Sequence, residues 1–136
     1  MDRKELIMNR IYKIENFTTC WTCTVEVDEA FVIGGKGKPD ELFNTFMAMK
    51  NMVLYWSGGV HRLVMNDNDV VKVFLQQLSR DIMILCTANR LDAAGVIKCF
   101  EDMEGYCSMD GSFGIKIIEV DTVDIGYDEF EIEEKP

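Results

Sequence analysis

Histidine is the side chain most often used to move protons near neutral pH, and this chain has one, His61. Ser57 precedes His61 by four residues and Asp67 and Asp69 follow it, so a nucleophile, a base and an orienting carboxylate occur in one segment. However, no nucleophile-elbow motif frames Ser57, which stands where a helix is expected to end. We therefore interpret His61 as a loop residue without a catalytic role, and we expect the protein not to be an enzyme.

Cysteines offer a second kind of chemistry, because Cys20 and Cys23 form a CxxC pair. A redox pair needs its first thiolate at a helix N-terminus, where the helix dipole lowers the thiol pKa. The flanking residues instead predict a strand, in which residues three apart point to opposite faces. A zinc site would need a second pair of ligands, and the other cysteines lack paired spacing. The thiols are interpreted as structural, and we expect no metal and no cofactor.

Two short runs are similar in composition to ligand-binding loops. Gly34-Gly35-Lys36-Gly37-Lys38 lacks the order of a P-loop, but its backbone N–H groups ahead of a helix could hold a small anion. We favour a flexible loop. Asp67-Asn68-Asp69 lacks the later glycine and glutamate of a calcium loop, and we interpret it as a helix cap.

The elements that would position these groups follow from hydrophobic periodicity. In chain order, we expect strands over 11–15 and 20–27, helices over 39–57, 67–85 and 92–101, and strands over 113–120 and 129–133. A turn at Asn16-Phe17-Thr18-Thr19 is expected to join the first two strands, and the second helix is expected to open at a cap at Asn66 or Asp67. The run 81–86 could also be a strand, but its apolar stripe stays in phase with the preceding helix. The order predicts an α+β fold, in which two hairpins form an antiparallel sheet of about four strands with helices packed on one face.

Length and charge limit the classes of function. A chain of 136 residues with 48% hydrophobic content is expected to form one domain over 1–136, with an extension over 1–9, a core over 10–133 and a tail over 134–136. A net charge of −10 argues against direct binding to nucleic acid or to an anionic membrane. The apolar runs are too short for a membrane span, and the N-terminus lacks a signal-peptide pattern. We therefore expect a cytoplasmic protein whose five cysteines are reduced.

The segment from Glu119 to Glu134 is rich in acidic residues and contains no basic one. Charge on an edge hairpin can simply prevent aggregation between sheets. Alternatively, the segment forms a negative surface that engages a basic groove, such as the nucleic-acid channel of a host enzyme. The residues assigned to this acidic face are Asp121, Asp124, Asp128, Glu129 and Glu131.

Six short motifs, taken in order and spacing, resemble a family of uncharacterised proteins. They are Trp21 with Val25-Glu26-Val27-Asp28, Tyr55-Trp56-Ser57-Gly58 with Arg62-Leu63, Asp67 with Asp69-Val70-Val71, Glu104-Gly105-Tyr106, Gly114-Ile115-Lys116-Ile117-Ile118, and Gly126-Tyr127-Asp128. The family is a domain of unknown function found mainly in bacteriophages and prophages, and the resemblance covers roughly Arg10 to Glu133. The chain departs from the pattern at Gly59-Val60-His61, where the family tends to carry acidic residues. The seven residues before Met8 are additional to the pattern, and Met8 is an alternative start.

The resemblance implies a small protein that acts inside an infected or lysogenic bacterium. Two hypotheses follow. The first is an inhibitor or adaptor that binds a host protein, for example a defence enzyme that handles nucleic acid, through the acidic face. The alternative is a protein, expected to be a homo-oligomer, that sequesters a nucleotide at a site drawn from Trp56, His61, Arg62, Tyr106 and Lys36.

Overall fold

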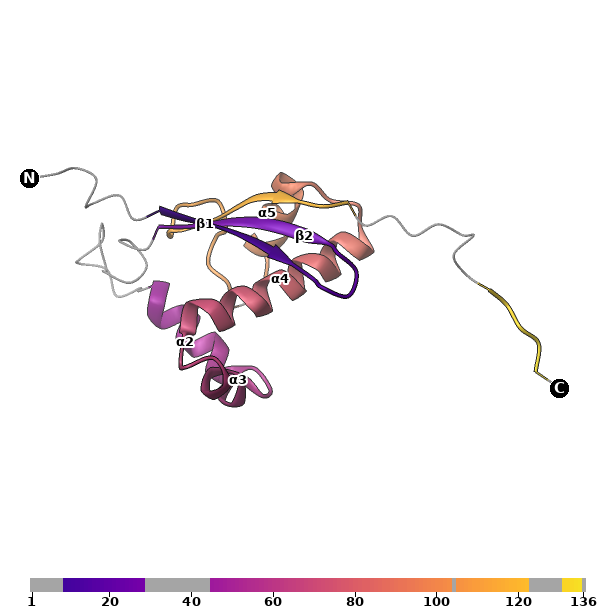
Figure 1. Ribbon diagram of the computed structural model, residues 1–136. Coiled ribbons are helices and arrows are strands. Elements are labelled where there is room, and N and C mark those ends of the chain that lie inside the picture. The colour runs from indigo at the N-terminus through magenta and orange to yellow at the C-terminus, as the bar shows by residue number, and fades with distance from the viewer. Residues whose placement is uncertain (1–8, 29–44, 104, 123–130, 136) are drawn as a thin grey trace, which may run out of the picture.

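A computed structural model of the chain describes residues 9–28, 45–103, 105–122 and 131–135. Its sheet contains β1 (Asn9–Glu15), β2 (Thr22–Asp28) and β3 (Ile115–Val120), antiparallel and in the order β1-β2-β3. β1 and β2 form a hairpin whose register pairs Glu15 with Thr22, and β3 pairs with the other edge of β2 (Figure 1). The strand β1 is therefore an edge of the described sheet.

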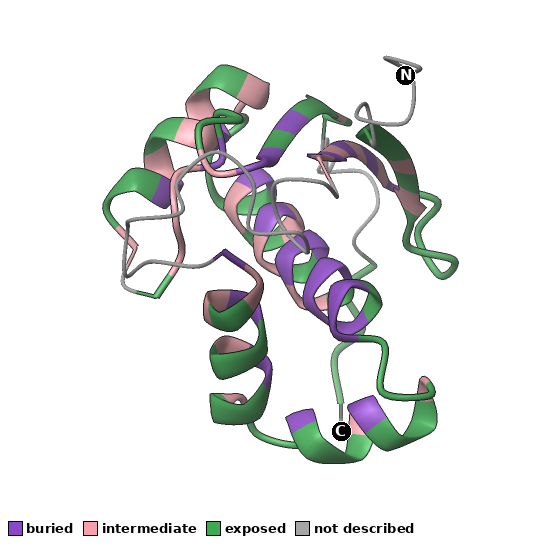
Figure 2. Ribbon diagram, turned by 90° about the vertical axis from the view of Figure 1, so that its left-hand side faces the viewer, coloured by how far each residue is buried: buried purple, intermediate pink, exposed green. Residues whose placement is uncertain are grey.

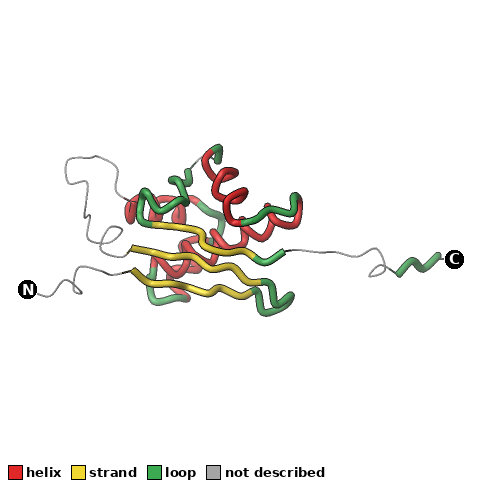
Figure 3. Tube along the Cα trace, turned by 90° about the horizontal axis from the view of Figure 1, so that it is seen from above, coloured by secondary structure: helices red, strands yellow, loops and turns green. Residues whose placement is uncertain are grey.

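Four helices occupy the middle of the chain: α2 (Thr45–Tyr55), α3 (Gly59–Met65), α4 (Val70–Ala88) and α5 (Ala93–Glu101). The long helix α4 crosses beneath the sheet, α5 packs beside β3, and α2 with α3 extends away from the sheet at the N-terminal end of α4 (Figures 1 and 3). No helix in the described part of the chain is both long and apolar enough to cross a membrane.

The hydrophobic core lies between the sheet and α4. On β2, the buried Cys23, Val25 and Val27 alternate with partly exposed polar residues, as expected for a strand with one covered face (Figure 2). The stripe predicted for α4 faces them, because Phe74, Leu78 and Ile82 are buried. The core then extends to Met49 and Val53 of α2, Phe100 of α5 and Ile115 and Ile117 of β3.

The predicted helices are confirmed where the structure describes them. The run 81–86 is helical, as its phase indicates. The third helix, predicted over 92–101, is α5, and Asp92 is its cap, whose Oδ1 accepts from the Gly95 N–H at 2.8 Å. The cap of α4 is Asp69, which accepts from the Lys72 N–H at 3.0 Å. The expected cap at Asn66 or Asp67 is wrong, because Asp67 and Asn68 have φ of 57° and 61° and form the preceding turn. The predicted helix start at 39–44 lies outside the described residues.

The segment after Gly58, predicted to be a loop, is a helix, α3. Gly58 does end the preceding helix, since its φ of 77° lies in the left-handed region that glycine adopts without strain. The chain then re-enters helical geometry, because Gly59 lies directly against the backbone of Val53 on α2. Hydrophobic periodicity does not predict α3, because only two residues of this helix, Gly59 and Leu63, are buried.

The α+β class, the antiparallel sheet and the first hairpin are confirmed. The described residues contain three strands rather than four. The turn expected around Asp124 and most of the fourth strand lie outside the described residues. The part that is described, Glu131 to Lys135, is exposed and forms no strand.

Candidate functional site

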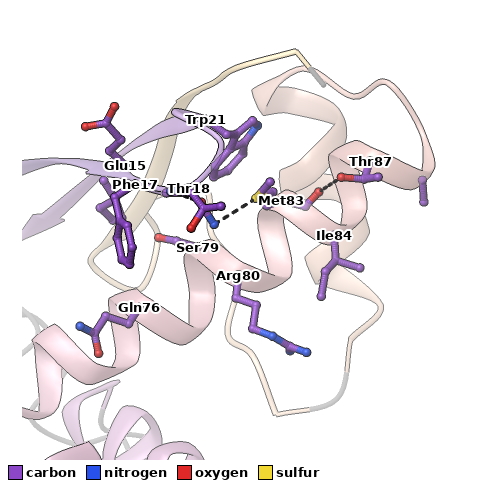
Figure 4. A pocket seen from close by; sticks show the side chains of 13 residues that line it. Glu15, Phe17, Thr18, Trp21, Gln76, Ser79, Arg80, Met83, Ile84 and Thr87 are labelled. Atoms are coloured by element: carbon purple, nitrogen blue, oxygen red, sulfur yellow. Dashed lines mark hydrogen bonds between the residues drawn. The ribbon is translucent and has the colours of Figure 1, made fainter. Parts of the chain in front are cut away.

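The β1–β2 hairpin turn and the C-terminal half of α4 enclose an open groove of about 950 Å³ (Figure 4). One wall comes from the hairpin and the other from successive turns of α4. The lining residues are Ile14, Glu15, Asn16, Phe17, Thr18 and Trp21 from the hairpin, and Gln76, Ser79, Arg80, Met83, Ile84, Thr87 and Ala88 from α4. Most of this lining is apolar, so the groove is suited to an apolar side chain of a ligand.

The hairpin turn is held in one conformation by Asn16. Its side-chain Oδ1 accepts hydrogen bonds from the Thr18 and Thr19 N–H groups at 3.0 and 3.1 Å, while its backbone carbonyl accepts from the Cys20 N–H at 2.7 Å. The Asn16 amide also points to the Met83 sulfur on α4, at 3.7 Å. The turn is therefore fixed both internally and against the helix.

This fixed turn presents Phe17 to solvent. The Phe17 side chain is 94% exposed and points toward the part of α4 that carries Gln76, whereas Ile84, which is 50% exposed, lies further along the helix (Figure 4). Exposing a large aromatic side chain forgoes the free energy of its burial, about 1.5–3 kcal/mol. Because the turn is already ordered, a partner that covered Phe17 would gain this energy without ordering the loop.

The floor of the groove is part of the core, and its polar groups are hydrogen-bonded. Trp21 is buried, and its indole Nε1 donates to the Asp121 carbonyl at 3.1 Å. The Ser79 hydroxyl donates to the Leu75 carbonyl at 2.7 Å and lies 3.6 Å from the Cys23 sulfur. Because these polar groups already have hydrogen-bond partners within the fold, the floor would bind a ligand mainly through apolar contact.

Charges lie at the rim of the groove. The lining contains two charged residues, Glu15 and Arg80, and the Arg80 guanidinium lies 3.6 Å from the Asp81 carboxylate. Asp121, of the predicted acidic face, lies at the same end of the sheet: its Oδ2 accepts from the Thr22 N–H and hydroxyl, both at 2.9 Å. Since Thr22 pairs with Glu15, two carboxylates flank Thr22 beside the groove.

The other predicted acidic residues are placed only in part. Glu131 is described and exposed. Asp124, Asp128 and Glu129 lie outside the described residues. The acidic face thus stays a prediction, anchored to the fold at Asp121.

Four of the five residues of the alternative ligand site are described, and the structure brings two of them into contact. Trp56 and Tyr106 do lie together, with ring centroids 6.5 Å apart, but both are half-buried against Phe74, at 6.0 and 5.9 Å. Tyr106 also packs edge-on to Phe100. Among these rings only Trp56 and Phe74 are stacked, and the two predicted ligand-binding rings are partly buried side chains packed against the core.

The Tyr106 hydroxyl has a specific partner. It donates to the Asp81 Oδ2 at 2.5 Å, and Gln77 donates to the other carboxylate oxygen at 3.4 Å. Burial, reinforced by the nearby Asp81 carboxylate, raises the pKa of the Tyr106 hydroxyl well above its ordinary value. The arrangement joins the loop before β3 to α4 and is structural.

Two further members of the alternative site are adjacent on α3. His61 is exposed on α3, Arg62 is half-buried on the same helix, and Lys36 lies outside the described residues. Ser57 is exposed in the turn before α3. No group of three or more His, Cys, Asp or Glu side chains in the described part of the chain could hold a metal ion.

All five cysteines are free thiols. Cys20 is exposed in the hairpin turn, with φ of 66°, whereas Cys23 and Cys86 are buried. Burial is the main cause that raises the pKa of the Cys23 and Cys86 thiols, and it raises that of Cys107 to about 11. The CxxC pair therefore contains one accessible thiol and one that is shielded.

We expect a thiol reagent such as Ellman's reagent at pH 8 to modify Cys20 much faster than Cys23 or Cys86, since only a thiolate reacts and burial disfavours it. The time course of absorbance should contain a fast phase that Cys20→Ser removes. Addition of denaturant should expose the slow thiols. Equal rates for Cys20 and Cys23 in the native protein would contradict the burial described here.

The residues of the groove are not singled out by the sequence patterns. The prediction of a turn at Asn16-Phe17-Thr18-Thr19 is correct, and the apolar residue inside that turn was the available signal. Ile84 was a second one, because it lies off the buried stripe of α4 and is nevertheless apolar. Neither signal indicates that the two side chains border the same groove.

Comparison with known proteins places most of the chain in a family. The model of a family described as "Protein of unknown function (DUF2528)" matches residues 40–132. The match includes α2 to β3 but neither β1 nor β2, so the hairpin wall of the groove and Trp21 lie outside it. No curated protein and no solved structure matches the chain.

Proposed function

We propose, from the premise that this chain belongs to the DUF2528 family, that it acts by stoichiometric binding of a partner protein at the groove between the β1–β2 turn and α4. The observation that carries the proposal is Phe17, an aromatic side chain that is 94% exposed on a turn that Asn16 holds in place. Aromatic anchors of this kind supply most of the free energy in protein–protein contacts.

The charge of the chain indicates the kind of partner. The net charge is −10, and Glu15 and Asp121 lie beside the groove. The groove lining also contains Arg80, so the negative charge lies on one side of the apolar centre. This arrangement suits a partner with an apolar side chain and basic residues beside it, because complementary charge speeds encounter and apolar burial slows dissociation.

A more specific purpose is proposed from the resemblance to phage and prophage proteins. In this account the chain is an accessory protein in the cytoplasm of an infected or lysogenic bacterium, and it serves counter-defence or host takeover. The partner would be a host protein that handles nucleic acid, whose basic channel is complementary to an acidic surface comprising Asp121, Asp124, Asp128, Glu129 and Glu131. Binding alone would block such a channel, so the account requires no catalysis by this chain.

Charge reversal tests the carboxylate beside the groove together with the proposed acidic surface. With a partner captured from infected cells and then purified, Glu15→Lys combined with Glu131→Lys should lower the affinity at low salt by about tenfold or more, because charges around an interface steer association. The affinity of the double variant should also depend much less on salt concentration, because salt then screens a weaker electrostatic attraction. Affinity measured by surface plasmon resonance at two ionic strengths checks both effects.

The matched control carries the same change in net charge elsewhere. Glu101 and Asp102 are exposed at the end of α5, which packs against β3 at the opposite edge of the sheet from β1. Glu101→Lys with Asp102→Lys should reduce the affinity by less than about threefold. If both double variants lose affinity equally, the net charge of the chain affects binding but the position of the reversed charges does not. If the captured species is a nucleotide without a protein, the proposed function is wrong.

A further inference from the structure

A second apolar surface lies on α3, away from the groove. Val60, Val64 and Met65 are 59%, 65% and 70% exposed, and their spacing places them on one side of the helix with His61 between them. Leu54 and Tyr55, at the end of the neighbouring α2, are exposed as well. We call Val60, His61, Val64 and Met65 the α3 face.

The α3 face is held rigidly on the rest of the fold. Gly59 lies so close to α2 that a Cβ atom would be 1.7 Å from the Val53 carbonyl oxygen. The opposite side of α3 inserts the buried Leu63 into the core. After α3, the Leu63 carbonyl accepts from the N–H groups of Asn66 and Asn68, which fixes the turn into α4. A rigid apolar face of this kind can be covered without ordering the chain.

The charge distribution around the α3 face is unusual for this protein. The chain carries 24 acidic residues, yet none lies between Thr45 and Asn66, where Lys50, His61 and Arg62 are the titratable basic groups. α3 is also at the end of the molecule farthest from the sheet (Figure 1). Two copies that met through this face would keep their acidic bodies apart, whereas contact at other acidic surfaces would bring like charges together.

We propose that the α3 face is the interface of a homodimer, in which α3 packs antiparallel to α3 of a second copy. A two-fold axis brings the beginning of one α3 close to the end of the other. His61 and Arg62 of one copy would then lie near Asp67 of the other, which is exposed in the turn after α3. The same pairing occurs twice, so the interface combines apolar contact at its centre with complementary charge at both ends.

Sedimentation equilibrium of the full chain tests this interface. The wild type should have about twice the monomer mass of 15.6 kDa at micromolar concentrations, and Val64→Glu should sediment as the monomer. Because each introduced carboxylate would be desolvated against the apolar beginning of the partner's α3, the dissociation constant of the dimer should rise at least about 100-fold. Val60→Glu should act in the same way. Circular dichroism should show that both variants fold, since both positions are largely exposed.

Ile132→Glu is the matched control, because it adds the same charge at a side chain that is 97% exposed in another part of the chain. This variant should remain dimeric. A wild type that is monomeric at all concentrations, a dimeric Val64→Glu variant, or an Ile132→Glu variant that dissociates as readily would each overturn the proposal. The α3 face is distinct from the groove, so Phe17→Ala should leave the dimer intact whether or not the groove binds a partner.

Discussion

Phe17→Ala is expected to weaken partner binding by about 30-fold or more, while the free energy of unfolding changes by less than about 0.5 kcal/mol. The first effect is the cost of about 2 kcal/mol or more that is typical of removing an aromatic anchor from an interface. The second follows because Phe17 is 94% exposed and contributes little to the core. Isothermal titration with the purified partner and urea denaturation separate the two effects.

Tyr55→Ala provides the comparison for Phe17→Ala. Tyr55 is an aromatic side chain of similar exposure, at 89%, but it lies at the end of α2 rather than on a turn beside a groove. Its truncation should change the affinity by less than about threefold, as for most residues outside an interface centre. Equal losses of affinity in the two variants would mean that exposed apolar surface in general, and not the groove, holds the partner.

Gly59→Ala is expected to destabilise the fold by about 3 kcal/mol or more. A Cβ atom at position 59 would lie 1.7 Å from the oxygen and 2.8 Å from the carbon of the Val53 carbonyl, so α2 and α3 would have to separate. Both contact atoms belong to the backbone of a helix, which cannot move aside as a side chain can. Urea denaturation followed by far-ultraviolet circular dichroism measures the loss.

Gly95→Ala is the corresponding control within a helix. At Gly95 the nearest atoms to a new Cβ are side-chain atoms, Leu91 Cδ2 at 3.1 Å and Asp92 Oδ1 at 3.3 Å. These groups can shift by a few tenths of an ångström, and alanine gains up to about 1 kcal/mol of helix propensity over glycine. The net change should therefore stay within about 1 kcal/mol. A Gly59→Ala variant as stable as Gly95→Ala would show that α2 and α3 do not pack as described.

The fold was predictable where burial leaves a periodic signal. The stripe on α4 is such a case, because Phe74, Leu78 and Ile82 face the sheet through several helical turns. The short helix α3 was not predictable, since it buries only two residues and is set by one glycine–backbone contact. Its exposed side is apolar, which removes the amphipathic contrast on which a sequence-based assignment depends.

The candidate site was less accessible to sequence reasoning than the fold. The prediction of a hairpin turn at 16–19 is correct, and Asp121 lies close to the groove. Trp56 and Tyr106 are natural choices as stacking residues because aromatic rings suit nucleotides, and the structure brings the two rings together, half-buried against Phe74. Phe17 and Ile84 are far apart in sequence and border one groove only through the packing of β1–β2 on α4.

The most direct test of partner binding at the groove is photo-crosslinking from position 17. A full-length chain with benzoylphenylalanine in place of Phe17 would be irradiated in infected bacterial cells, and the same probe at position 55, which is exposed on α2 outside the groove, would serve as the reference. The account predicts one host protein joined to position 17 in fixed ratio, absent from position 55, and lost when Ile84→Asp places a carboxylate in the groove wall. An equal set of crosslinks from both positions, or none from position 17, would contradict a partner-binding role for this groove.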